Sequence, residues 1–198
     1  MDVPTPMEPP EGTQALLFDC DGTLVDTLRL YRECWRATFG RHGYTMTDEW
    51  FDQWIGHDVH TLVALAFPDA SVDYRRGIVD EGMAMFFESS HMLEPLEHVV
   101  AVARDYHGRV PMAVVSGGLG HAVRESLHAV GIADLFDAIV TLEDVESTKP
   151  APDGYVLAME MLGVDPRHCV AYEDSSTGME SARAAGIATI VDVNWHQA

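Results

Sequence analysis

Short, continuous apolar runs are the main pattern along this sequence. They are residues 15–18 (ALLF), 110–116, 138–141, 169–174 and 189–193. Within each run the apolar residues are mostly consecutive and do not alternate with polar ones. This pattern predicts parallel strands that are buried on both faces of a sheet.

Amphipathic segments separate these runs from residue 94 onward, and their spacing predicts helices. The predicted helices are residues 95–106, 119–130, 153–162 and 176–185. Gly131, Gly163 and Gly186 follow three of them, at the positions where helix C-caps belong. Strand and helix therefore alternate, which predicts an α/β fold with an open, doubly wound, Rossmann-like parallel sheet.

Residues 27–93 interrupt this alternation, because they carry Trp and Phe residues at helical spacing and no strand-like run. A loop between a strand and a helix usually has only a few residues. We therefore expect an all-helical domain, residues 27–93, inserted into a core made of residues 15–26 and 94–198. The helices expected in the insertion are residues 28–42, 47–54, 58–67 and 72–89.

The composition narrows the class of partner. The 198-residue chain has a formal net charge of −20, which repels nucleic acid and anionic lipid. No apolar run approaches the roughly 20 residues of a membrane span. We expect a small-molecule substrate, neither nucleic acid nor membrane as partner, and a monomer. Residues 1–14 are acidic and Pro-rich, which predicts a disordered leader and not a secretory signal.

The three cysteines, Cys20, Cys34 and Cys169, are scattered without a paired spacing. Such usage favours the reducing cytoplasm over a disulfide framework. Cys20 lies between two aspartates, so it is either a reactive thiol or a side chain packed beneath the strand.

Residues that can carry chemistry follow the ends of the predicted strands. In order they are Asp19 and Asp21, then Ser116 and Gly117, then Lys149, which is the only lysine, and finally Glu173 and Asp174. In an open parallel sheet these strand ends share one edge, where ligands bind. We therefore expect the residues to meet in one site.

The chemistry of such a site follows from its charges. Crowded carboxylates need a cation, and hard oxygen donors without a His or Cys cluster favour Mg²⁺. Lys149 and the cation can neutralise an anionic substrate, while Ser116 and the N–H groups of the glycines after it cradle its oxygens. These features predict phosphoryl transfer, in which one aspartate attacks phosphorus and the other protonates the leaving oxygen.

Four segments resemble, in order, the motifs of the haloacid dehalogenase superfamily, in its β-phosphoglucomutase-like branch: DCDGTLVDT, VVSGG, TKPAPDGY and VAYEDSSTGMESARAAGI. The resemblance implies that Asp19 is the nucleophile and Asp21 the general acid and base. It implies Mg²⁺ held by the Asp19 side chain, the Asp21 main-chain carbonyl and Asp174, with help from Glu173. It implies that Ser116 and Lys149 bind phosphate. The insertion becomes a cap over the substrate, with hinges near Thr27 and residues 94–95.

Within this branch the sequence favours a phosphatase. Thr23 follows the DCDG element, as is common in the phosphatases, whereas the mutases tend to have Val there. The position of Tyr31 lacks the His of the mutases, and the stretch WIGHDVHTL lacks their Arg for a second phosphate. We expect a Mg²⁺-dependent phosphatase for a small phosphomonoester, a sugar or sugar-acid phosphate, with His57 as a candidate specificity residue. A β-phosphoglucomutase-type mutase is the alternative, and a non-catalytic phosphoacceptor module is a third reading.

Overall fold

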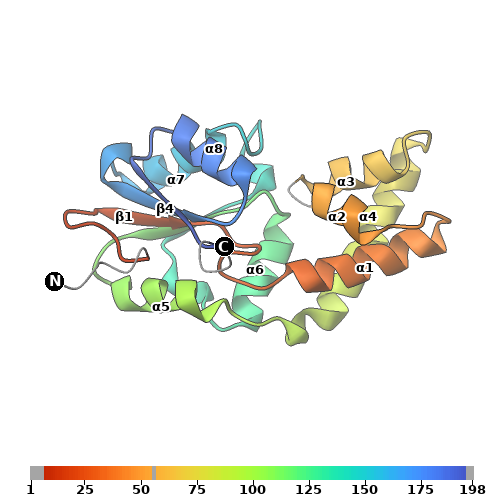
Figure 1. Cartoon of the computed structure of the whole chain (residues 1–198), viewed down its shortest axis with the longest axis horizontal. Helices are drawn as coiled ribbons and strands as arrows, with labels where there is room; N and C mark the ends of the chain where they lie inside the picture. The colour runs from red at the N-terminus through yellow and green to blue at the C-terminus, as the bar shows by residue number, and fades with distance from the viewer. Residues whose placement is uncertain (1–6, 55–56, 195–198) are drawn as a thin grey trace.

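The protein is built around a single parallel sheet (Figure 1). The computed structural model describes residues 7–54 and 57–194. The five strands of the sheet lie in the order β3-β2-β1-β4-β5, and every neighbouring pair is parallel. The strands are Ala15–Phe18 (β1), Met112–Val115 (β2), Ala138–Val140 (β3), Cys169–Glu173 (β4) and Thr189–Asp192 (β5). The five predicted strands are thereby confirmed to within two residues at each end.

Successive residues of a strand point to opposite faces of the sheet, which explains why the apolar runs are continuous. In β1, Leu16 and Phe18 belong to one buried apolar cluster, and Ala15 and Leu17 belong to the other. Phe18 stacks on Tyr172 of β4 with ring centroids 4.8 Å apart. Both faces of the central strands are therefore packed against apolar side chains.

Helices cover both faces of the sheet, as the strand–helix alternation predicts. Figure 1 shows α7 and α8 on one face and α5 and α6 on the other. None of the described helices is long and apolar enough to cross a membrane. The core helices are Glu97–Tyr106 (α5), Gly120–Ala129 (α6), Asp153–Leu162 (α7) and Ser176–Ala184 (α8), and the 3₁₀ helices are Ser90–Met92 (η1), Ala133–Leu135 (η2), Leu142–Asp144 (η3) and Pro166–His168 (η4).

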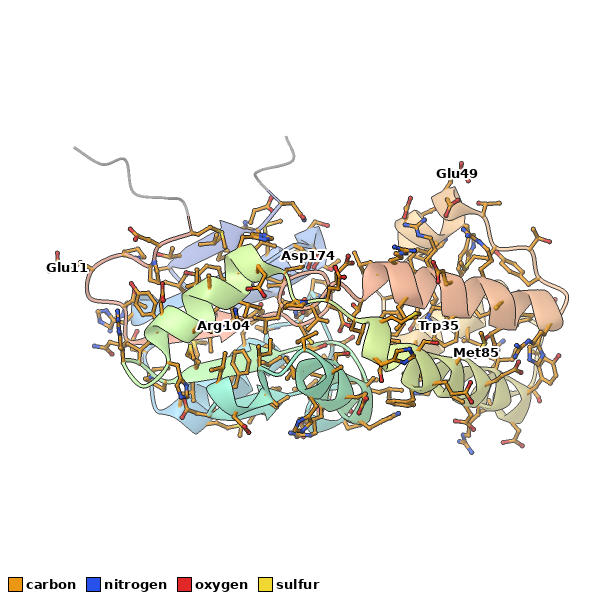
Figure 2. All side chains as sticks on the ribbon, turned by 90° about the horizontal axis from the view of Figure 1, so that it is seen from below. Glu11, Trp35, Glu49, Met85, Arg104 and Asp174 are labelled. Atoms are coloured by element: carbon orange, nitrogen blue, oxygen red, sulfur yellow. The ribbon has the colours of Figure 1, made fainter. Side chains whose placement is uncertain are left out.

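The segment between β1 and α5 forms a separate group of helices at one end of the sheet (Figure 1). We call this group the helical insertion. Tyr31 stacks on Phe86 with ring centroids 4.5 Å apart, and Trp35 packs directly over Gly82. Figure 2 shows Trp35 and Met85 inside this group. Its helices are Leu28–Arg41 (α1), Asp48–Trp54 (α2), Val59–Ala66 (α3) and Val72–Ser89 (α4).

The chain leaves the core and returns to it through two segments that lie side by side. The N–H of Asp26 donates to the carbonyl of Glu94 at 2.9 Å, and the N–H of Leu96 donates to the carbonyl of Leu24 at 2.9 Å. Beyond them, the Ser90 hydroxyl donates to the Glu125 carboxylate of α6 at 2.7 Å. The two connections are therefore paired with each other, and the second is also bonded to α6.

The N-terminal segment differs in part from its prediction. Residues 1–6 lie outside the described residues, but Met7 packs against the core. Met7 is only 6% exposed, its carbonyl accepts a hydrogen bond from the buried Tyr172 hydroxyl at 2.7 Å, and the Gln14 N–H donates to the carbonyl of His168 at 2.8 Å. The expected disorder is therefore not met at Met7, because its side chain fills apolar space and its carbonyl satisfies a buried hydroxyl.

Candidate active site

The strand register brings the predicted residues to one edge of the sheet. Phe18 is level with Val114 of β2 and with Tyr172 of β4, so the residues that follow these strands are neighbours. Figure 2 shows Asp174 at the end of the sheet that faces the helical insertion. A cavity of about 540 Å³ lies here, a typical size for a small-molecule site. The sheet edge and helices α1, α2 and α3 all contribute to its wall.

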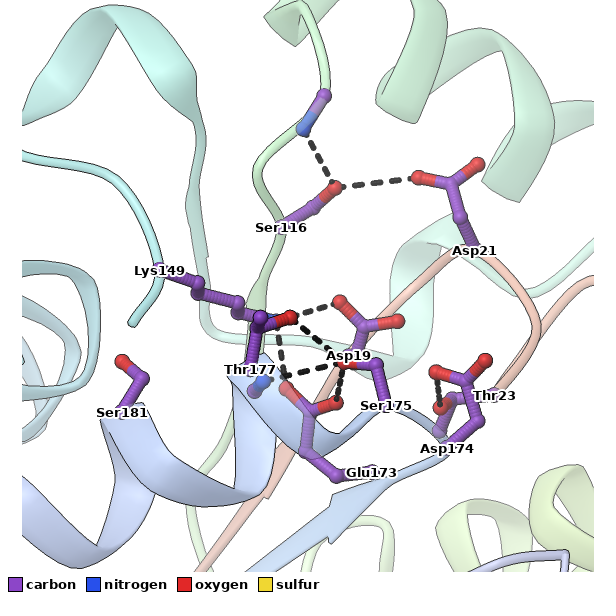
Figure 3. A network of polar contacts seen from close by, with 12 residues as sticks. Asp19, Asp21, Thr23, Ser116, Lys149, Glu173, Asp174, Ser175, Thr177 and Ser181 are labelled. Atoms are coloured by element: carbon purple, nitrogen blue, oxygen red, sulfur yellow. Dashed lines mark hydrogen bonds and ion pairs between the residues drawn. The ribbon is translucent and has the colours of Figure 1, made fainter. Parts of the chain in front are cut away.

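Lys149 connects two carboxylates at this edge (Figure 3). Its Nζ lies 2.6 Å from Asp19 Oδ1 and 2.6 Å from Glu173 Oε1. Glu173 is fully buried, and it also accepts hydrogen bonds from the Tyr155 hydroxyl at 2.7 Å and from the Ser175 hydroxyl at 3.1 Å. Burial raises the pKa of Asp19 despite the opposing charge of Lys149. Burial alone lowers the pKa of Lys149, but the two carboxylates outweigh it and hold that pKa above its usual value.

Three carboxylates at this edge offer oxygen donors that fit a hard divalent cation. One oxygen from each of Asp19, Glu173 and Asp174 lies within 4.8 Å of the others. Burial, and next the charge of Glu173, raise the pKa of Asp174 to about 6. Gly22 has a φ of +83°, and a Cβ there would lie 2.5 Å from Asp174 Oδ2, so only glycine allows the backbone so close. Concentrated anionic oxygens of this kind are the donors that Mg²⁺ binds.

Asp21 lies beside Ser116, away from the lysine (Figure 3). Its Oδ1 accepts a hydrogen bond from the Thr27 hydroxyl at 2.8 Å, and its Oδ2 accepts one from the Ser116 hydroxyl at 3.2 Å. Ser116 Oγ in turn accepts the N–H of Gly118 at 3.0 Å. Burial raises the pKa of Asp21, and the bonds from Thr27 and Ser116 partly offset that rise. Asp21 is thus positioned by the start of the insertion and by the end of β2.

Comparison with known proteins identifies the family of this chain. A model of the haloacid dehalogenase-like hydrolases matches residues 16–191 of this chain. The chain belongs to the haloacid dehalogenase-like hydrolases. The predicted family and the parallel-sheet fold are both confirmed.

Relatives of this hydrolase include named phosphatases and mutases. Fructose-1-phosphate phosphatase YqaB of Escherichia coli (strain K12) is 31% identical over 193 residues, which cover 89% of this chain and 95% of that protein. β-Phosphoglucomutase of Mycobacterium bovis is 29% identical over 218 residues, which cover 93% and 82%. The crystal structure of CbbY from Rhodobacter sphaeroides in complex with phosphate has the same fold, with a TM-score of 0.82 at 24% identity, covering 90% and 85%. The predicted β-phosphoglucomutase-like branch is confirmed, and the hydrolase is a phosphoric monoester hydrolase.

Most of the predicted site residues line the cavity of this hydrolase. Glu173 is the exception, since it lies behind Asp19 and Lys149 without lining the cavity. Cys20 is fully buried and burial raises the pKa of its thiol, which favours the packed alternative over the reactive one. The predicted residues on the cavity wall are Asp19, Asp21, His57, Ser116, Gly117, Lys149 and Asp174.

The sequence did not reveal two hydroxyl groups that position the carboxylates. Tyr155 on α7 donates to Glu173, and Thr23 donates to Asp174 Oδ1 at 3.2 Å. Tyr155 has the helical spacing of an ordinary core aromatic, so the pattern gives no sign of its hydrogen bond. Thr23 follows the DCDG element and could be found only through the strand register that places β1 beside β4.

Proposed function

We propose that this hydrolase cleaves the monoester of a small phosphorylated sugar through a phosphorylated Asp19, with Mg²⁺ as cofactor. One observation carries the proposal. Asp19 Oδ1 is bound by Lys149, whereas Oδ2 has no hydrogen bond with the described residues, and the side chain lies on the cavity wall. A carboxylate fixed through one oxygen presents the other as a nucleophile. The sugar class rests on relatives such as the fructose-1-phosphate phosphatase.

In the first step, Asp19 forms a bond to phosphorus while the ester P–O bond breaks. Lys149 and the Gly117 N–H balance the negative charge on the phosphoryl oxygens, and the Ser116 hydroxyl can turn to them from Asp21. Asp21 donates a proton to the leaving oxygen of the sugar. Its raised pKa suits this task, because a donor must hold its proton near the working pH.

In the second step, Asp21 removes a proton from a water molecule, which attacks phosphorus. The bond between Asp19 and phosphorus breaks, so inorganic phosphate leaves and the free carboxylate returns. The helical insertion covers the cavity opposite these residues and acts in this proposal as the cap that excludes water during the first step. Thr27 and residues 94–95 serve as its hinges, at the paired connections.

Asp19, Asp174 and the main-chain carbonyl of Asp21 would hold the Mg²⁺. When bound, the ion neutralises developing charge on the phosphoryl oxygens. Glu173 assists less directly in this proposal, because both of its oxygens already accept hydrogen bonds. It holds Lys149 in place and adds negative charge next to the metal ligands.

The wider setting is also part of the proposal. A net charge of −20 supports a small phosphorylated metabolite as the substrate, with neither nucleic acid nor membrane as partner. Scattered cysteines support a cytoplasmic location. We also propose that the protein is a monomer.

The mutase is the second candidate, since β-phosphoglucomutases are among the relatives. The test uses purified protein, Mg²⁺ and β-glucose 1-phosphate primed with a trace of the 1,6-bisphosphate, beside a panel of sugar phosphates. Free phosphate and glucose 6-phosphate are followed together. Free phosphate from panel members without glucose 6-phosphate supports the phosphatase. Glucose 6-phosphate without net phosphate release would refute it in favour of the mutase.

A further inference from the structure

The helical insertion forms one wall of the cavity. The polar groups on this wall are of two kinds, those with hydrogen-bond partners and those without a partner among the described residues. Some already have partners: Asp58 accepts the N–H groups of His60 and Thr61 and the Thr61 hydroxyl, and Asp52 is paired with Arg32 at 2.5 Å. The others have no hydrogen bond with the described residues. They are the Tyr31 hydroxyl, the Gln53 amide and the His57 imidazole.

Tyr31 is the most informative of these groups. The residue is only 8% exposed, and its ring is stacked on Phe86. Within the described residues, Ser126 has the only buried side-chain oxygen or nitrogen without a hydrogen-bond partner. The Tyr31 hydroxyl has no partner among the described residues, so it reaches open space, and the space that Tyr31 lines is the cavity. A fixed ring that presents an unpartnered hydroxyl to a cavity is ready to bind a ligand group, because leaving such a hydroxyl unpaired is costly.

The charges on the wall restrict that ligand group. Among the described lining residues, Lys149 is the only lysine or arginine, and Asp19 and Glu173 already bind it at the phosphate end. Asp52 and Asp58 lie on the side of the insertion. A carboxylate or second phosphate placed there would lose water without gaining an unpaired cation from the lining residues. It would also face the carboxylate of Asp58, whereas the charge of Asp52 is already paired with Arg32.

We propose that Tyr31, with Gln53 and His57, binds the hydroxyl groups of an uncharged sugar or polyol, and that this wall rejects substrates with a second anionic group. The inference rests on the proposed function, whose substrate class it narrows from sugar and sugar-acid phosphates to neutral ones. Leu28, Val59 and Leu62 line the same wall and contact the C–H face of the sugar. Tyr31 is a specificity-determining residue, separate from the reacting carboxylates.

Binding to the Asp19→Asn protein tests this inference without turnover. The probes are sorbitol 6-phosphate and 6-phosphogluconate, which differ only in a terminal CH₂OH or carboxylate, and calorimetry in Mg²⁺ gives the dissociation constants. We expect sorbitol 6-phosphate to bind at least about tenfold more tightly, because the carboxylate of 6-phosphogluconate would lose water without gaining a cationic partner. Adding Tyr31→Phe should weaken the binding of sorbitol 6-phosphate about three- to tenfold, which is the effect of losing one hydrogen bond. It should leave the binding of inorganic phosphate unchanged. Adding Gln53→Lys should reverse the preference toward 6-phosphogluconate.

Tyr44→Phe is the matched control, since Tyr44 lies in the insertion but does not line the cavity. Equal dissociation constants for the two probes, failure of both to bind, or a Tyr31→Phe effect that is absent or equal for inorganic phosphate would each overturn the inference. Failure of the proposed function looks different: the wild-type protein would bind sorbitol 6-phosphate with the expected preference and release no phosphate from any monoester.

Discussion

Replacing Asp174 by Asn should make the metal-free protein more stable at neutral pH, although it removes a proposed metal ligand. Asp174 lies close to Asp19 and Glu173, and its partly buried carboxylate forms no ion pair with a described residue, although the charge of Lys149 offsets part of the repulsion. Burial raises its pKa from 3.8 to about 6, so the folded state disfavours the charged form. The neutral amide of Asn avoids that cost and can still accept the hydrogen bond from Thr23.

The magnitude follows from this pKa. The interval between 3.8 and about 6 corresponds to about 3 kcal/mol, because one pKa unit is worth about 1.36 kcal/mol. A raised carboxyl pKa destabilises the folded state above about pH 6, and this cost fades as the pH falls toward 3.8. The stability advantage of the variant should therefore be about 3 kcal/mol at pH 7.5 and about half of that at pH 5. At pH 7.5 it should raise Tm by about 6–12 °C.

The assay is urea unfolding in EDTA at pH 7.5 and at pH 5, with wild type, Asp174→Asn and the control Asp134→Asn. Asp134 is exposed, so its replacement should leave the free energy of unfolding within about 0.5 kcal/mol of wild type. Adding Mg²⁺ should stabilise wild type and Asp134→Asn and have much less effect on Asp174→Asn. A variant less stable than wild type at pH 7.5 in EDTA, or an advantage that does not change with pH, would refute the electrostatic account of this edge.

Two further substitutions test the role of Asp21 as the general acid and the packing of the helical insertion. Asp21→Asn should slow phosphate release from an alkyl phosphate about 10²–10⁴-fold, because the leaving oxygen no longer receives a proton. The leaving group of p-nitrophenyl phosphate needs no proton, so this substrate should still give a stoichiometric burst of p-nitrophenol in stopped-flow absorbance. Loss of the burst would contradict the role assigned to Asp21. Gly82→Ala should lower the free energy of unfolding by about 1–3 kcal/mol, because its Cβ would lie 2.2 Å from the Trp35 ring. Gly77→Ala on the same helix meets open space and should raise that free energy by up to about 1 kcal/mol, so equal effects in urea unfolding would contradict the packing argument.

The sequence predicted the strands and the edge of the sheet where Asp19, Ser116 and Asp174 meet, because continuous apolar runs determine the strands and parallel strands end at one edge. The sequence also led us to expect a helical insertion over residues 27–93, since 67 residues exceed any ordinary loop, and helices α1 to α4 lie within that range. These features depend on periodicity and length, which are local properties of the chain.

The contacts between side chains could not be predicted from the sequence. The burial of Glu173 behind Lys149, the pairing of Asp21 with Ser116 and the open hydroxyl of Tyr31 each depend on contacts between residues far apart in the chain. The packing of Met7 likewise depends on the Tyr172 hydroxyl, which the Pro-rich composition does not reveal. Periodicity places a residue on an element, whereas its partners follow from packing.

Phosphate release by wild type and by Asp19→Asn is the most direct test of the central claim. Both proteins are assayed with Mg²⁺ and fructose 1-phosphate, the substrate named for one relative, beside the panel of sugar phosphates. Circular dichroism establishes that the variant is folded. We predict phosphate release from one or more monoesters by wild type and none above background by Asp19→Asn, since the attacking oxygen becomes an amide. Undiminished release by the folded variant would contradict the assignment of Asp19 as the nucleophile.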